Sequence, residues 1–155
     1  MTIRDIKPED FDATKTLFMQ LQNLHVTHRP DLYCNINKPY INETYYKSLL
    51  EEPDKISLGA EIEEKVVGLC ISDIRKTEGE NFTPRIYLHI KNLIVDENYR
   101  KKGIGKALFN EAIKRAKIRG AETVDLKVFS FNTDAIEFYK SLGMSVQNLT
   151  LERQI

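Results

Sequence analysis

The residues with the clearest chemical potential lie between Arg100 and Lys106, a stretch that reads RKKGIGK. A continuous apolar run, Leu93-Ile94-Val95, precedes them and is typical of a strand buried on both faces. Apolar residues then recur at helical spacing, which predicts an amphipathic helix directly after the loop. These residues are Ile104, Ala107, Leu108, Ala112, Ile113 and Ala116.

A strand-to-helix turn of this composition favours an anion. The first N–H groups of a helix have no intrahelical acceptor and carry the positive end of the helix dipole. Gly103 and Gly105 would let an anion come close to these groups. Positive charge is supplied by Arg100, Lys101, Lys102 and Lys106. The loop therefore predicts a phosphate or pyrophosphate site, and the alternative is an ordinary loop with solvated lysines.

Two motifs resemble the signatures of the Gcn5-related N-acetyltransferase (GNAT) family. Arg100, Gly103 and Gly105 match the cofactor-loop pattern Arg/Gln-x-x-Gly-x-Gly/Ala, and residues 132–144 match Asn-x-x-Ala-x-x-Phe-Tyr-x-x-x-Gly-Phe/Met. A nucleotide P-loop would need a Gly-Lys-Ser/Thr sequence, and a dinucleotide fingerprint would need a third glycine where Leu108 stands. The resemblance covers essentially the whole chain.

The expected fold is a single α/β domain over residues 1–155. The resemblance implies a mixed, mostly antiparallel sheet with one splayed parallel strand pair, flanked by about four helices. We expect the parallel pair to be the strand ending at Val95 and a strand at 122–129, because a helix connects them. Other strands are predicted at 2–6, 56–63, 65–75 and 144–153, and other helices at 8–25, 42–51 and 132–142. Gly68, inside a strand, indicates a bulge or a close backbone approach.

The family resemblance implies acetyl-CoA as the cofactor, bound by the loop and by the strand before it. Its pantetheine arm is expected to pair with the backbone of Leu93, Ile94 and Val95. Tyr139 is implied as the acid that protonates the leaving thiolate; the alternative is a ring that only packs beside Phe138. The remaining expected cofactor contacts are Arg100, Lys101, Lys102, Gly103, Ile104, Gly105, Lys106, Asn132 and Ala135. The alternative for Asn132 is that it only caps the last helix, which begins with Asn132 or Thr133 as its cap and is expected to end at Gly143.

Residues 25–40 break the helical pattern, and in the resembled family this region lies over the acceptor. Candidate acceptor contacts are His25, His28, Arg29, Asp31 and Tyr33. The alternative is a lid packed by Tyr33 and Tyr40 with solvated charges. Two histidines three residues apart could suggest a metal pair, but a third ligand is missing, so we expect no metal.

The general base is less clear, because Lys91 and Asn92 stand where many relatives carry a carboxylate. His89 lies on the same strand, and histidine as a residue type titrates near neutral pH. A bulge in the strand would change the face to which its side chain points, so the sequence does not give that face. An ordered water chain without a single base is the favoured hypothesis. Lys91 is expected to disfavour polycationic acceptors. Asp73 could project a carboxylate into the acceptor pocket, but it is interpreted as a surface residue at a strand end.

The amino-acid composition limits the classes of binding partner that we expect. The chain carries 23 basic and 23 acidic residues, so no net field favours nucleic acid or a membrane surface. We expect a cytoplasmic protein, since neither a signal peptide nor a long apolar segment is visible. Cys34 and Cys70 lack metal-ligand spacing and are expected to be reduced. A homodimer formed through edge strands is a further expectation.

Three functions remain open at this point. The first is an acetyl-CoA-dependent N-acetyltransferase acting on a primary amine of a small molecule, by direct attack in a ternary complex. The second acetylates a protein N-terminus or lysine, and the third is a non-catalytic acyl-CoA-binding regulatory module. The intact loop and Tyr139 favour the first.

Overall fold

The computed structural model describes residues 1–34 and 41–155, and its centre is a five-stranded sheet in the order β1-β2-β3-β4-β5. The first three pairings are antiparallel, whereas β4 and β5 run parallel, which confirms the expected mixed sheet. The strands are β1 (Thr2–Asp5), β2 (Lys55–Ile62), β3 (Lys65–Lys76), β4 (Ile86–Val95) and β5 (Thr123–Leu126).

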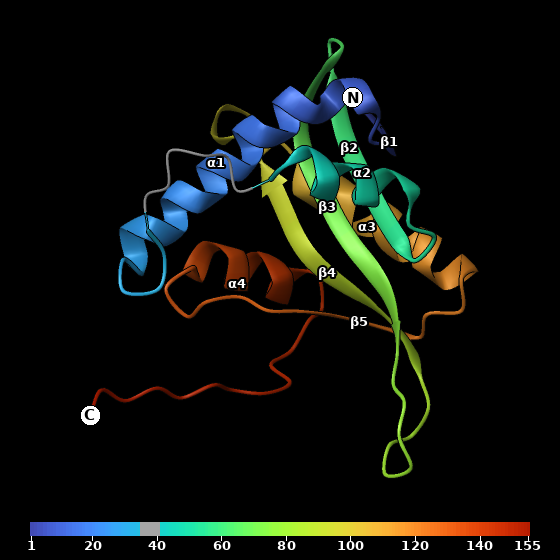
Figure 1. The fold of residues 1–155 in the computed structure, drawn as a ribbon, viewed down its shortest axis with the longest axis vertical. Helices are drawn as coiled ribbons and strands as arrows, with labels where there is room; N and C mark the ends of the chain where they lie inside the picture. Colours follow the sequence, from blue (N-terminus) through green and yellow to red (C-terminus); the bar gives the residue numbers. More distant parts are fainter. Residues whose placement is uncertain (35–40) are drawn as a thin grey trace.

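Four α-helices cover this sheet (Figure 1). They are α1 (Phe11–His28), α2 (Glu43–Glu51), α3 (Ile104–Ile118) and α4 (Thr133–Ser141), with short 3-10 turns η1 (Pro8–Asp10) and η2 (Glu97–Tyr99). Helix α1 ends at His28 rather than near His25 as predicted, because the first helix-breaking residue is Pro30. None of the helices in the described ranges is long and apolar enough to cross a membrane.

Two separate hydrophobic cores fix the faces of the sheet. Leu88 and Ile90 pack in one core with α3 residues such as Leu108, whereas Leu69 and Ile71 pack in the other. The second core contains residues of α1 and α2, so these helices cover one face and α3 the other. Alternate residues of a strand point to opposite faces. The face to which a β3 or β4 side chain points therefore follows from the core in which its neighbours along the strand pack.

A bulge in β4 lies close to the loop singled out above. Ile71 of β3 opposes Asn92, but the next residue, Ser72, opposes Ile90, so Lys91 is an extra residue in β4. Parallel pairing with β5 stops at the same place, because its last partners are Ile90 and Leu126. The two strands therefore separate directly after the bulge, as expected for the splayed pair.

Gly68 is confirmed as a point of close approach. A Cβ at this position would lie 3.2 Å from the Ile94 carbonyl oxygen and 3.1 Å from Leu108 Cδ1. The β2–β3 register also shifts here, because Ala60 opposes Gly68 and Glu61 opposes Val66. The missing side chain lets α3 pack closely on the sheet.

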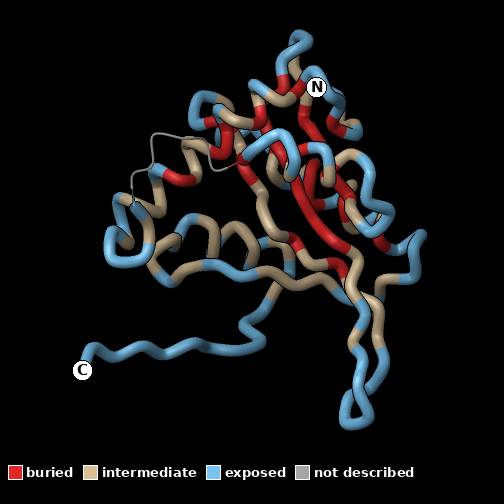
Figure 2. The backbone as a smooth tube through the Cα atoms, in the orientation of Figure 1, coloured by how far each residue is buried: buried red, intermediate tan, exposed pale blue. Residues whose placement is uncertain are grey.

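The predicted strand over 144–153 is wrong. In the structure, this segment has no regular secondary structure; Met144 packs against the core, and the residues after it run away from the sheet as an exposed tail (Figure 2). A strand needs a neighbouring edge to pair with, and no strand partner for the tail exists within the described residues. The paired part of β5 is likewise only Thr123–Leu126, shorter than the predicted 122–129.

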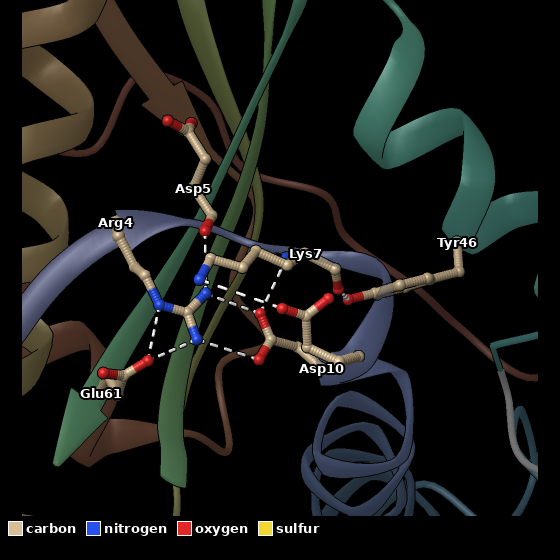
Figure 3. Close-up of polar contacts among 7 residues, drawn as sticks. Arg4, Asp5, Lys7, Asp10, Tyr46 and Glu61 are labelled. Carbon is tan, nitrogen blue, oxygen red and sulfur yellow. Dashed lines mark hydrogen bonds and ion pairs between the residues drawn. The ribbon is translucent and has the colours of Figure 1, made fainter. Parts of the chain in front are cut away.

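A charged network ties the start of the chain to the sheet (Figure 3). Arg4 donates through Nη1 to Asp10 Oδ2 at 2.7 Å and through Nε to Glu61 Oε2 at 2.6 Å. Asp10 also accepts the Lys7 N–H at 2.8 Å, and Tyr46 of α2 donates to the Lys7 carbonyl at 2.6 Å. Burial alone would raise the pKa of the Asp10 carboxyl, but its bonds to Arg4 and Lys7 outweigh this and lower it.

Candidate active site

The loop before α3 presents free backbone donors. Gly103 has a φ of 80° and caps the helix, and its carbonyl accepts the Ala107 N–H at 3.0 Å. The N–H groups of Ile104, Gly105 and Lys106 precede that first helical bond and have no acceptor in the described part of the chain. The positive φ explains why glycine stands at position 103.

The basic residues of the loop are exposed and retain their charge for a ligand. Arg100 donates through Nε to the Val95 carbonyl at 3.1 Å, and Lys102 donates to the Asn98 carbonyl at 3.2 Å. Lys101 and Lys106 are also exposed. No carboxylate among residues 1–34 and 41–155 pairs with any of the four, so their charge is not neutralised within the protein.

Gly105 brings the start of α3 against α4. A Cβ at this position would lie 3.3 Å from Phe138 Cζ and 3.7 Å from Val95 Cγ2. The two helices and the end of β4 thus meet at one point. The missing side chain at Gly105 therefore lets α4 and the end of β4 pack directly against the start of α3, beside the free N–H groups.

The end of β4 has one unpaired edge. Residues 92–95 pair with β3 on one side, but beyond Ile90 the strand has no β5 partner on the other. Leu93 and Val95 pack on the α3 side of the sheet, and Ile94 packs on the α1–α2 side. An extended ligand could add to this edge as a further strand would.

Tyr139 lies half-buried in α4 on the same side as α3. Its ring packs 5.2 Å from Phe138 and 6.3 Å from Phe109, between ring centroids. Burial raises the pKa of the Tyr139 phenol well above its ordinary value, and the nearby Cys70 contributes in the same direction. Burial also raises the pKa of the Cys70 thiol to about 12. Both groups are therefore protonated at neutral pH.

Asn132 is confirmed as the cap of α4. Its side-chain oxygen accepts the Ala135 N–H at 3.3 Å, while Thr133 is the first helical residue. The helix ends as expected, because Gly143 follows its last turn with a φ of 87°. Between the cap and this glycine, Tyr139 packs against the core on the α3 side.

Three of the predicted acceptor residues come together in an aromatic cluster at the end of α1. His25 stacks on Tyr33 with ring centroids 4.7 Å apart, and His28 stacks on Phe131 at 4.6 Å. Phe129 completes the cluster, 5.4 Å from Phe131. Burial lowers the pKa of His25, which favours its neutral form. Phe129 and Phe131 were not among the predicted site residues, although the FSF run that begins three residues after the end of β5 was a visible signal.

Arg29 and Asp31 are bound to each other. Arg29 Nη2 lies 2.7 Å from Asp31 Oδ2 and 2.8 Å from Glu152 Oε2 in the tail, and its guanidinium lies over Phe129. This mutual pairing leaves less of either charge for a ligand. Tyr40, the other expected lid residue, lies outside the described residues.

A row of ionisable residues crosses four strands on the α1–α2 face. Lys55 of β2 opposes Asp73, Asp73 opposes His89, and His89 opposes Asp125 of β5. His89 lies between Leu88 and Ile90, which point toward α3, so its side chain points to the opposite face. His89 Nδ1 and Asp125 Oδ1 are 2.6 Å apart. The direction of His89, which the sequence left open, is thereby known.

Asp73 was wrongly interpreted as a surface residue, because it is 8% exposed. It binds three cations, with Lys91 Nζ at 2.9 Å, Lys55 Nζ at 3.1 Å and Arg75 Nη2 at 3.2 Å. Burial raises the pKa of its carboxyl, but the bonds to Lys91 and Lys55 outweigh this and lower it. Lys91, which replaces the expected carboxylate, is itself paired with one. Across residues 1–34 and 41–155, no three His, Cys, Asp or Glu side chains are grouped closely enough to hold a metal.

Comparison with curated proteins gives relatives of one kind. The chain is 32% identical over 147 residues to an uncharacterised N-acetyltransferase of Methanocaldococcus jannaschii, covering 92% of this chain and 59% of that protein. It is 24% identical over 151 residues to the L-amino acid N-acetyltransferase AaaT of Escherichia coli, covering 95% and 84%. A third match, 39% identical over 54 residues, covers 35% of this chain and 36% of the E. coli ribosomal protein bS18-alanine N-acetyltransferase.

Solved structures share the fold. A mutant protein of Bacillus halodurans superposes with a TM-score of 0.95 at 29% identity, covering 100% of this chain and 99% of that one. An aminoglycoside N-acetyltransferase crystallised with coenzyme A superposes with a TM-score of 0.76 at 14% identity, covering 99% and 98%. The second likeness shows the fold alone.

A family model completes the assignment. The model of the acetyltransferase (GNAT) family matches residues 19–144, a range that includes the loop, the strand split and Tyr139. The chain therefore belongs to the acetyltransferase (GNAT) family.

Proposed function

We propose that the protein is an acetyl-CoA-dependent N-acetyltransferase that transfers the acetyl group directly to a primary amine of a small molecule. The observation that carries this proposal is the meeting of three features around the end of β4. They are the free N–H groups at the start of α3, the unpaired edge of residues 91–95, and the protonated Tyr139. Each serves a different part of a thioester ligand.

The cofactor contacts follow from this arrangement. The N–H groups of residues 104–106, with Arg100, Lys101 and Lys102, would hold the phosphates. The free edge of Leu93, Ile94 and Val95 would hold the pantetheine arm, and its N–H groups would stabilise a developing oxyanion. Acetyl-CoA supplies the reactive thioester there. Asn132 and Ala135 are then positioning residues, because they fix the start of α4.

Tyr139 is the proposed acid. Departure of a thiolate requires a proton, and a phenol with a raised pKa still carries its proton at neutral pH. Its hydroxyl has no hydrogen-bond acceptor within the described residues, so no internal partner competes for the proton. The half-buried ring, held against Phe138 and Phe109, fixes the direction of the hydroxyl.

A small acceptor is supported by the surroundings of the split. The aromatic cluster of His25, His28, Tyr33, Phe129 and Phe131 offers flat apolar surface, and the charged row offers polar partners. The relative whose name specifies a small acceptor, the L-amino acid N-acetyltransferase AaaT, supports the same class.

A protein acceptor is the second candidate. It is favoured by one observation, the 54-residue match to an enzyme whose printed substrate is the alanine of ribosomal protein bS18. The shared segment is about a third of either chain and therefore says little about the acceptor.

The test is thiol release from acetyl-CoA across a panel of amino acids, polyamines, aminoglycosides and peptides with free N-termini. Wild type and Tyr139→Phe are compared, with Tyr87→Phe as the matched control outside the site. We expect turnover of one small-amine class and a loss of about 100-fold or more in Tyr139→Phe. Turnover of peptides alone would move the assignment to the protein acceptor. Turnover of no amine, with acetyl-CoA still bound, would favour a regulatory acyl-CoA-binding module.

A further inference from the structure

We infer that His89, oriented by Asp125, is the general base that deprotonates the acceptor amine. This inference rests on the proposed transfer reaction and assigns the step that the sequence left without a residue. It replaces the water chain, the favoured hypothesis from the sequence, with a specific side chain.

Position is the first argument. His89 belongs to one of the last β4–β5 pairs, and the strands separate after Ile90. The side chain points to the face opposite α3, whereas Tyr139 packs in the core on the α3 side. An amine entering from the α1–α2 face would meet His89 before it reaches the split, and the thiolate would leave toward Tyr139. His89 and Tyr139 thus lie on opposite faces of the sheet.

The hydrogen bond to Asp125 gives the imidazole a defined role. Asp125 Oδ1 lies 2.6 Å from Nδ1 and accepts a hydrogen bond from the Nδ1–H group. The imidazole lone pair is then on Nε2. Nε2 has no hydrogen-bond partner among residues 1–34 and 41–155. A histidine held in one tautomer by a carboxylate, with its second nitrogen free, is the arrangement that proton abstraction needs.

The other ionisable groups on this face are less suited to be the base. Asp73, directly opposite His89, is bound to Lys55, Lys91 and Arg75, and these bonds lower the pKa of its carboxyl. It is therefore a weak proton acceptor. From the helices packed on this face, the described residues bring one charged group to the row, Glu52 after α2, and it is paired with Lys55 at 3.0 Å.

The proton balance is complete. The ammonium form of the acceptor gives one proton to Nε2 of His89, which passes it to water. The neutral nitrogen attacks the thioester carbon, so a C–N bond forms as the C–S bond breaks. The thiolate takes the Tyr139 proton, and the second proton lost by the nitrogen restores Tyr139. The net products are the amide, the free thiol and one proton.

The test is the dependence of kcat/KM on pH, from about pH 6 to about pH 9, for wild type and variants with the best amine of the panel. His89→Gln keeps an amide donor for Asp125 but cannot accept the proton. Asp125→Asn keeps the hydrogen bond without the charge, and Asp54→Asn is its matched control, because Asp54 is exposed and its side chain has no contact in the described structure. Acetyl-CoA affinity is measured for each variant by calorimetry.

We expect a loss of at least about 100-fold in His89→Gln and of about tenfold or more in Asp125→Asn, with acetyl-CoA affinity unchanged. The residual rate of His89→Gln should rise with pH, because the amine then arrives already neutral. A His89→Gln variant with the wild-type rate and pH profile would overturn the inference while the transfer reaction stands. A wild type that binds acetyl-CoA but transfers to no amine would overturn both.

Discussion

The molecule contains two buried charge networks in which the charges are reversed. At the N-terminal edge, the single cation Arg4 is shared by the carboxylates of Asp10 and Glu61. In the charged row, the single carboxylate of Asp73 is shared by Lys55, Arg75 and Lys91. Both lower the pKa of a buried aspartate, and burial alone would raise it in each case.

The two networks differ in what surrounds them. The Arg4 network also satisfies backbone groups, because Asp10 accepts the Lys7 N–H and Tyr46 donates to the Lys7 carbonyl (Figure 3). It joins β1, β2 and α2, and none of its printed bonds involves β4 or β5. The Asp73 network adjoins His89 and Asp125 at the point where β4 and β5 separate. We interpret the first as structural and the second as the floor of the acceptor site. The role of a buried charge network is therefore inferred from the residues around it, because the bonds within the two networks are similar.

The largest effect on stability is expected from Arg4→Met. The change leaves the 8% exposed Asp10 without its main partner, and breaking one side of a buried pair costs about 3 kcal/mol. Urea unfolding measures the loss. The kcat/KM of the folded variant should match that of wild type, and a fall of more than a few fold would show that the Arg4 network is not purely structural.

Asp73→Asn should lower stability less and activity more. The three cations lose their shared carboxylate, but the 28% exposed Lys91 and 38% exposed Arg75 can turn to water, so we expect a loss of about 2 kcal/mol. The uncompensated positive charge should also raise the KM for a cationic amine. Unfolding curves combined with steady-state kinetics test this, and an unchanged KM would place the acceptor away from the row.

Acid should destabilise the protein through both networks. In the folded protein, the pKa values of Asp10 and Asp73 lie below the value of about 4 that an aspartate has in the unfolded chain. Their stabilisation is therefore complete above that pH and is lost as the pH falls through the folded values. Urea unfolding from neutral to about pH 3 should show this loss, and Arg4→Met should show a smaller one. If the free energy of unfolding fell equally steeply with pH in both proteins, Arg4 would not be the cause of the lowered pKa of Asp10.

Lys91→Met is expected to have the smallest effect. Asp73 keeps Lys55 and Arg75, so stability should change by about 1 kcal/mol or less. Removing one positive charge beside the split should improve kcat/KM for diamines relative to monoamines by roughly fivefold. Competition assays with paired amines measure the ratio. A ratio equal to that of wild type would show that Lys91 does not influence acceptor choice.

Much of the fold could be predicted from the sequence because local signals and the fold agree. The Arg100–Gly105 loop, the amphipathic α3 and the Asn132 cap depend on spacing within one element, and the structure confirms all three. The tail over 144–153 could not be predicted this way, because its apolar residues resemble a strand but pairing depends on a partner edge elsewhere.

The site beyond the cofactor loop depends on register. Asp73, His89 and Asp125 are far apart in sequence, and a one-residue bulge at Lys91 decides which side chains share a face. Sequence spacing therefore left His89 without a direction and placed Asp73 at the surface. The aromatic cluster was missed in part because Phe129 and Phe131 are about 100 residues from His25 and His28 in sequence and meet them only in the folded chain.

The central claim is that the α3 loop and the β4 edge bind acetyl-CoA, and calorimetric titration of the wild-type protein tests it most directly. We expect a dissociation constant on the order of 10 μM, since enzymes commonly hold substrates in this range. Affinity should weaken at higher salt, because four uncompensated cations surround the loop. The absence of measurable binding at millimolar acetyl-CoA would contradict the account.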